Sequence, residues 1–118
     1  MNSQDLKFRT KSFALRIIKL AEAMPKTVSG RAVANQIVRS GTSVAANYRA
    51  ALRGRSRQEF LSKIGIVVEE VDETLFWLEI ILEAKLIKEK QLQELYKEAD
   101  ELVSIFCSIS KTTKNHKS

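Results

Sequence analysis

The chain has 118 residues, 44% of them hydrophobic, and a single cysteine, Cys107. This length fits one domain with its own core, and a lone cysteine excludes a framework of intramolecular disulfides. No run of about 18 uncharged apolar residues predicts a membrane-spanning helix, and the N-terminus lacks a signal-peptide pattern. We therefore expect a cytoplasmic protein with no membrane partner.

Charge is unevenly distributed along the sequence. Residues 1–57 hold 12 Lys and Arg against 2 Asp and Glu, whereas residues 58–118 hold 8 Lys against 12 Asp and Glu, and the whole chain carries a net charge of +6. All the arginines lie in the first part. Such an asymmetry is typical of a basic face for nucleic acid, and equally of basic helices paired with an acidic one.

Two helices are predicted in the first half, over residues 5–24 and 30–53. In the first, apolar residues such as Phe13, Ile17 and Leu20 share one face, and Pro25 ends the helix. The second contains Gly41 in a stretch of small residues, which favours either a close approach of another backbone or a kink. We expect a continuous helix, ended by Gly54 in the left-handed conformation.

The third predicted helix, residues 56–84, is the longest and most apolar. Ser56 and Glu59 form a capping box at its start. Its main apolar stripe recurs at steps of three and four: Phe60, Ile64, Val67, Val71, Leu75, Leu78 and Leu82. Apolar residues off that stripe include Ile66, Phe76, Trp77 and Ile80. They are a candidate interface between copies of the chain, the alternative being a wider intramolecular core.

A fourth helix is predicted over residues 88–110, where Leu92, Leu95 and Leu102 lie on one seam. Four amphipathic helices joined by short loops predict an all-α, antiparallel up-down-up-down four-helix bundle. Residues 1–110 would form this single domain. Residues 111–118 are polar and basic, and we expect a disordered tail there.

The third helix carries an acidic cluster made of Glu69, Glu70, Asp72 and Glu73. Such a cluster suits either a divalent ion or ion pairs to a neighbouring helix. Because helices rise equally per residue, positions on the second and third helices lie level when their numbers sum to about 110. We therefore predict a structural ion pair of Arg39 with Glu69, Glu70 or Glu73, Glu70 first, with both partners at least half buried.

A second basic group lies around the predicted turn between the second and third helices. Its members are Arg49, Arg53, Arg55, Arg57 and Lys63. Only Glu59 offsets them locally, and the guanidinium fork suits phosphate oxygens. These residues are candidates for binding a nucleic-acid backbone, although a solvated helix face has the same pattern. No motif that reads bases is present.

Catalytic patterns are missing from the sequence. The only histidine, His116, is in the expected tail, no Glu-x-x-His motif occurs, and no glycine-rich phosphate loop is present. Cys107 follows Phe106 and is expected to be a buried or half-buried hydrophobe. We predict no catalytic residue, no metal site and no cofactor, and hence no enzyme.

Residues 36–82 resemble the four-helix-bundle family encoded by intervening sequences in bacterial 23S ribosomal RNA genes. The residues that carry the resemblance are Gln36, Arg39, Ser40, Ser43, Asn47, Tyr48, Arg49, Arg53, Ser56, Glu59, Phe60, Lys63, Glu69, Glu70, Asp72, Glu73, Trp77 and Leu78. Many members read N-I-A-E-G where this chain reads N-Y-R-A-A. The role of that glutamate in the family is therefore not assigned to any residue of this chain.

The resemblance implies a closed homo-oligomer, a pentameric ring. It also implies distant kinship with the accessory protein of diversity-generating retroelements, a basic ring associated with nucleic acid and a reverse transcriptase. The leading hypothesis is a non-enzymatic homo-oligomer that binds RNA or DNA backbone, RNA first, with a protein partner as a further expectation. The alternative is a structural or interaction scaffold whose arginines form ion pairs between subunits.

Overall fold

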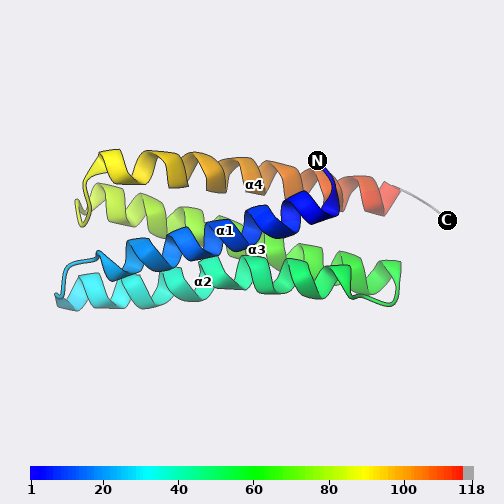
Figure 1. Ribbon diagram of the computed structural model, residues 1–118, viewed down its shortest axis with the longest axis horizontal. Coiled ribbons are helices and arrows are strands. Elements are labelled where there is room, and N and C mark those ends of the chain that lie inside the picture. The colour runs from blue at the N-terminus through cyan, green and yellow to red at the C-terminus, as the bar shows by residue number, and fades with distance from the viewer. Residues whose placement is uncertain (116–118) are drawn as a thin grey trace.

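The computed structural model describes residues 1–115, and these form an elongated bundle of 51 × 20 × 20 Å. Its helices are α1 (Ser3–Glu22), α2 (Val28–Leu52), α3 (Arg57–Glu83) and α4 (Glu89–Asn115). Successive helices run antiparallel (Figure 1). The prediction of an all-α, up-down-up-down four-helix bundle is therefore confirmed.

Side-chain caps begin the first three helices. Ser56 accepts a hydrogen bond from the backbone N–H of Glu59, which is one half of the predicted capping box, but the Glu59 carboxylate accepts from the N–H of Arg55 and not from that of Ser56. Thr27 caps α2 by accepting from the N–H of Gly30. At the start of α1, which was not predicted to have a cap, the side chains of Asn2 and Asp5 each accept a hydrogen bond from the other's backbone N–H. Each cap satisfies N–H groups that the first helical turn leaves without a partner.

Helix ends differ from the prediction in two places. Gly54 does not adopt a left-handed conformation; the residue that does is Lys85, with φ of 57°. There the N–H groups of Lys85 and Leu86 bond the carbonyls of Leu82 and Ile81, the Schellman pattern that ends α3. The second difference is α4, which continues through Asn115, so residues 111–115 are helical and not a disordered tail. Residues 116–118 of the expected tail, including His116, lie outside the described residues.

One core runs the length of the bundle and receives residues from every helix. Ile17, Ile37, Ile64 and Phe106 are fully buried, each from a different helix. At Gly41, a Cβ atom would lie 2.8 Å from Cγ2 of Ile17, which is too close. α2 passes through this point as a continuous helix, so Gly41 serves the close approach of α1 and not a kink.

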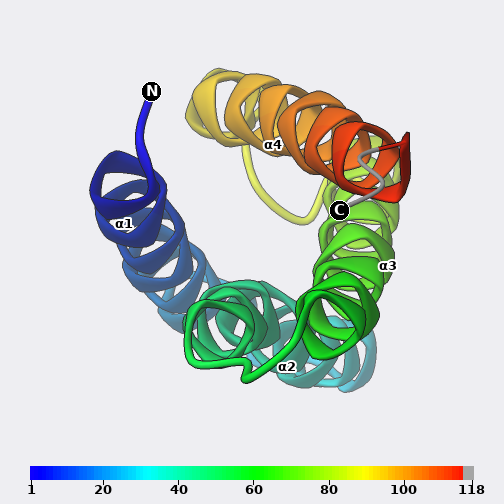
Figure 2. The ribbon, with the colours of Figure 1, turned by 90° about the vertical axis from the view of Figure 1, so that its right-hand side faces the viewer.

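Seen along its axis, the bundle places α1 and α3 at opposite corners, with α2 and α4 between them (Figure 2). The α1–α4 edge is the most open of the four sides. A groove of about 660 Å³ follows this edge near the α3–α4 turn, between Leu20 of α1 and Leu95 of α4. Further along the edge, Arg9 of α1 bonds Glu98 of α4 through Nε at 2.7 Å and Nη2 at 2.6 Å.

Candidate nucleic-acid interface

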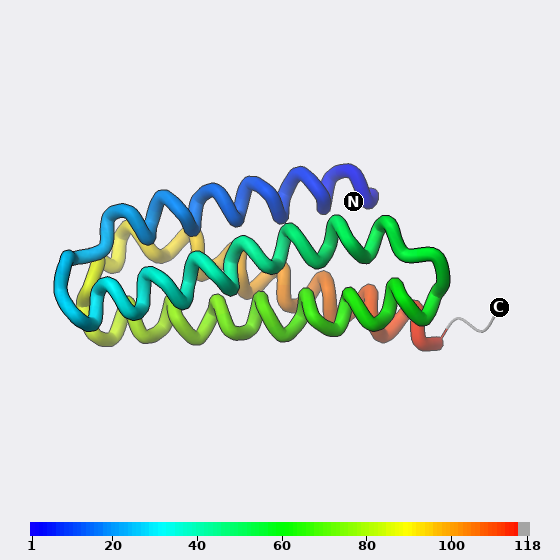
Figure 3. Tube along the Cα trace, turned by 90° about the horizontal axis from the view of Figure 1, so that it is seen from below, coloured from blue at the N-terminus to red at the C-terminus, as the bar shows by residue number. Residues whose placement is uncertain are grey.

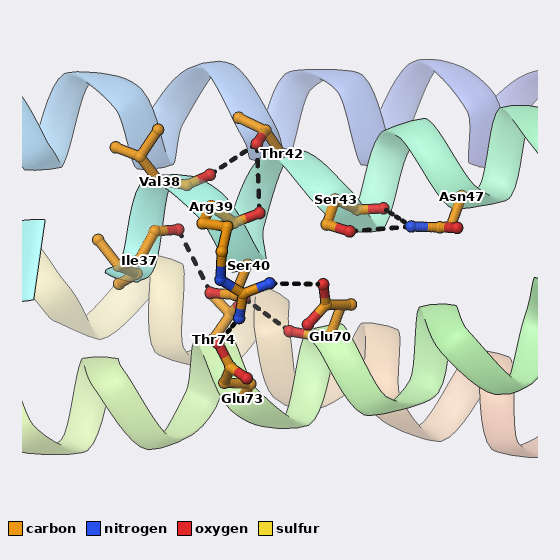
Figure 4. A network of polar contacts seen from close by, with 10 residues as sticks. All are labelled: Ile37, Val38, Arg39, Ser40, Thr42, Ser43, Asn47, Glu70, Glu73 and Thr74. Carbon is orange, nitrogen blue, oxygen red and sulfur yellow. Dashed lines mark hydrogen bonds and ion pairs between the residues drawn. The ribbon is translucent and has the colours of Figure 1, made fainter. Parts of the chain in front are cut away.

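Arg39 and the acidic cluster meet across α2 and α3, as Figure 4 shows. Nη1 of Arg39 lies 3.1 Å from Oε2 of Glu70, and Nη2 pairs with Glu73. The Glu70 side chain is 14% exposed, but that of Arg39 is 52% exposed, so the expected half burial fails for the arginine. The hydrogen bond to Glu70 is the main cause that raises the pKa of Arg39. Arg39 is therefore engaged in ion pairs within its own chain.

The other acidic residues of the cluster face outward. Glu69 and Asp72 are exposed and pair with no cation in the described part of the chain. Within residues 1–115, no group of three or more His, Cys, Asp or Glu side chains is arranged to hold a metal ion. The cluster therefore divides into an ion pair with α2 and a free acidic surface on α3.

A buried pair of hydroxyls lies beneath this ion pair and was not found from the sequence. The oxygens of Ser40 and Thr74 are 2.9 Å apart, and both residues are fully buried. The backbone carbonyls of Ile37 and Glu70 lie within hydrogen-bond reach of the two hydroxyls. Because a polar pair in an apolar core keeps its bonds in only one alignment, it fixes the register of α2 against α3.

Arg49, Arg53 and Arg55 are exposed around the α2–α3 turn. None of them has a carboxylate within 4.0 Å among residues 1–115. Glu59, the nearest acid in sequence, accepts a hydrogen bond of 2.6 Å from the backbone N–H of Arg55. Its carboxylate is thus engaged with the loop backbone, and the three guanidinium groups stand open to solvent.

Arg57 has a different role from the other arginines of the turn. Its Nε and Nη2 donate to the carbonyls of Thr113 and Lys114, each at 3.0 Å. Carbonyls at a helix C-terminus lack intrahelical partners and carry partial negative charge, so this guanidinium caps α4. Arg57 is therefore a structural residue, tying the end of α4 to the α2–α3 turn.

This contact adds lysines to the same end of the bundle. Lys111 and Lys114, from the segment expected to be a separate tail, are exposed on the last turns of α4. Figures 1 and 3 show the α2–α3 turn and the end of α4 together at one end of the molecule. We call Arg49, Arg53, Arg55, Lys63, Lys111 and Lys114 the basic end. Its two α4 lysines were not predicted from the sequence.

The candidate interface residues of α3 have different degrees of exposure. Phe76 is 49% exposed, whereas Ile66, Trp77 and Ile80 are partly buried. The rings of Phe76 and Trp77 meet edge to face at 4.9 Å. Nε1 of Trp77 is buried without a hydrogen-bond partner among the described residues. Trp77 and Ile80 thus partly serve the core, which the sequence analysis held open as the alternative.

Two further observations concern residues outside the basic end. Cys107 is exposed, not buried or half-buried as expected. On α1, Phe8, Leu15 and Ile18 are 77%, 59% and 38% exposed. This outer stripe was not predicted, although the steps of seven and three between these residues place them on one helix face.

Residues 1–115 thus define a small all-helical bundle whose basic end lies on its outer surface. Residues 4–108 match the family model described as 23S rRNA-intervening sequence protein, and the chain belongs to this family. The resemblance seen in residues 36–82 is thereby confirmed.

A solved structure with the same fold is that of a protein with unknown function from the S23 ribosomal protein family of Bacteroides thetaiotaomicron. It is 32% identical, the alignment covers 94% of this chain and 99% of that one, and the TM-score is 0.86. No curated protein matches the chain. Among the described residues, no helix is long and apolar enough to cross a membrane.

Proposed function

We propose that this protein is a non-enzymatic homo-oligomer that binds the phosphate backbone of nucleic acid, RNA first, through the basic end. The observation that carries the proposal is the exposure of Arg49, Arg53 and Arg55 without carboxylate partners within residues 1–115. Guanidinium groups that are not used inside the fold are free to form fork-like contacts with phosphate oxygens.

The arrangement around these arginines supports the same proposal. Arg57 joins the end of α4 to the turn, so Lys111 and Lys114 lie at the same end of the bundle as the arginines. Glu59, the one acid close in sequence, is held by the backbone of Arg55. The surface combines cations from α2, α3 and α4 without a motif for base edges, which suits binding of a phosphate backbone with little sequence preference.

Assembly of several chains into one oligomer would raise the affinity of the basic end for nucleic acid. Phe76 is a half-exposed aromatic side chain on α3, with Ile80 one turn further along. Two neighbouring apolar side chains on one helix face suit a contact between chains. Several copies of the basic end in one particle would convert weak individual contacts into a much stronger combined one.

Oligomerisation is tested by light scattering at micromolar concentration. We expect a mass several times the 13.4 kDa of one chain. Phe76→Glu combined with Ile80→Glu should release monomers, because charge in an apolar contact cannot be solvated. The matched control is Val28→Glu, which removes another exposed apolar side chain, at the start of α2, and should leave the mass unchanged. A wild-type protein that stays monomeric would refute the assembly.

Nucleic-acid binding is tested by titrating labelled single-stranded RNA and duplex DNA at several salt concentrations. The triple variant Arg49→Ala, Arg53→Ala, Arg55→Ala should bind more weakly. On single strands it should lower the log–log salt slope by about 2, at about 0.7 for each phosphate that is no longer neutralised. Arg57 is left intact because its removal would also release the end of α4.

The control removes the same number of charges from the opposite end of the bundle, by Lys26→Ala, Arg31→Ala and Lys88→Ala. All three residues are exposed. Equal losses of affinity in both triple variants would mean that affinity depends only on the net charge, and would reject the basic end as the site. If neither nucleic acid binds below about 100 μM at low salt, where non-specific binders still register, the scaffold alternative replaces this proposal.

A further inference from the structure

The outer faces of α1 and α3 carry exposed apolar residues with opposite charges around them. On α1, the stripe of Phe8, Leu15 and Ile18 extends about 15 Å along the helix, at 1.5 Å per residue. On α3, the outer face carries Phe76, 49% exposed, and Ile80. Because α1 and α3 stand at opposite corners, these faces point to opposite sides of the bundle (Figure 2).

Charge separates most of the two faces, the exception being Glu22, an exposed acid seven residues after Leu15 on the outer face of α1. Residues 6–19 of α1 contain five cations and no acid, whereas residues 64–84 of α3 contain six acids and no cation. Some of these groups are used within the chain: Arg9 and Arg16 face acids of α4, and Glu70, Glu73 and Glu79 have partners. Within residues 1–115 this leaves three exposed cations on α1, Lys7, Lys11 and Lys19, and three exposed acids on α3, Glu69, Asp72 and Glu83.

We propose that the outer face of α1 in one copy docks on the outer face of α3 in a second copy. The apolar stripes would be buried together, and the lysines around the first would face the acids around the second. This rests on the homo-oligomer of the proposed function and adds which surfaces form the contact. Pairing α1 with α1, or α3 with α3, would bring like charges together, which costs free energy.

Such a contact is heterologous, since each copy offers a different surface to each of its two neighbours. Repeating it produces a ring when the rotation closes and an open filament when it does not. Light scattering separates the two. The mass of a ring is constant at concentrations above its dissociation constant, whereas the mass of a filament rises with protein concentration. Higher salt should weaken the association, because the charges lie at the exposed rim.

The first test is cross-linking between single-cysteine variants in a Cys107→Ser background, which removes the exposed native thiol. Leu15→Cys and Phe76→Cys proteins with different tags are mixed, refolded together and treated with a short dimaleimide. We expect a mixed dimer to be the main product, and each variant alone to give less than a tenth of that yield. Strong cross-linking of Leu15→Cys with itself would show α1 against α1 and would overturn the proposal.

The second test is charge reversal. Lys11→Glu with Lys19→Glu should raise the dissociation constant of the assembly at least tenfold, and Glu69→Lys with Asp72→Lys should do the same. A chain with all four changes should regain most of the wild-type association, because the two faces again carry opposite charges. Recovery requires that these faces meet, so a quadruple variant weaker than either pair would refute the contact.

The outcomes separate this inference from the proposed function. A wild-type oligomer without the mixed cross-link contradicts the α1–α3 contact and leaves the assembly standing, whereas a wild-type monomer contradicts both. Binding to phosphatidylserine vesicles offers a third result. If Phe8→Glu with Leu15→Glu abolishes vesicle binding and leaves the mass of the assembly unchanged, the α1 stripe belongs to a membrane surface, and the contact is overturned.

Discussion

Replacing Gly41 with leucine is expected to lower the free energy of unfolding by about 3 kcal/mol, at the upper end of the range for overpacked cores. Gly41 is buried in α2, and an added Cβ would lie 2.8 Å from Cγ2 and 3.0 Å from Cβ of Ile17. Ile17 is itself fully buried, so it has no free space into which to move. The larger side chain must therefore push α1 away from α2.

Gly65 provides the matched control for this substitution. It lies within α3, and no atom comes within 4 Å of a Cβ placed there. Leucine at this position should stabilise the protein by up to about 1 kcal/mol, because glycine is a poor helix former. Urea unfolding of both variants at one protein concentration gives the comparison. Equal effects of the two substitutions would contradict the close approach of α1 and α2 at Gly41.

Sequence alone was sufficient for the parts of the fold that depend on local pattern. Apolar spacing set the number and approximate bounds of the helices, and Ser56 with Glu59 placed the start of α3 to within a residue. Equal rise along two antiparallel helices also put Arg39 level with Glu70, 3.1 Å apart in the structure. These inferences needed only two neighbouring helices and a short turn.

The basic end required information that local pattern lacks. Arg57 donates to Thr113 and Lys114, which follow it by more than 50 residues, and the contact depends on how far α4 extends. The last turns of α4 are polar, so they carry no apolar spacing that marks a helix. The role of Arg57 and the position of Lys111 were therefore inaccessible before the helices were assembled.

The outer stripe of α1 was missed for a different reason. Apolar residues surround much of this helix. Phe13, which is buried, and Phe8, which is 77% exposed, are the same residue type. Periodicity finds the face with most apolar residues and assigns that face to the core. A second apolar face is recognised only when neighbouring helices are in place and leave it uncovered.

Removal of the Arg9 side chain is expected to lower the free energy of unfolding by about 2 kcal/mol, as for loss of hydrogen bonds to a charged group. Arg9 and Glu98 form a two-bond ion pair across the open α1–α4 edge, and their side chains are only 23% and 15% exposed. The Arg9→Ala substitution leaves the carboxylate of Glu98 poorly hydrated and without its cation. The edge itself has little other contact to compensate.

Arg16→Ala on the same helix provides the comparison. Its guanidinium is 4.0 Å from the carboxylate of Glu94, whose side chain is 90% exposed, so the loss of stability should be below about 0.5 kcal/mol. The hydrogen bond from Arg9 to Glu98 raises the pKa of Arg9, so this arginine stays charged and its contribution does not fall as pH rises through neutrality.

A double-mutant cycle with Glu98→Ala isolates the energy of the Arg9–Glu98 pair. The combined variant should lose less stability than the sum of the two single losses, by about 1–2 kcal/mol. Additive losses would mean that the two side chains act independently, and that packing of their aliphatic stems, not the ion pair, closes the α1–α4 edge. The Arg9→Lys variant separates the effect of charge from that of the two hydrogen bonds, because lysine keeps the charge but lacks the fork that engages both oxygens of Glu98.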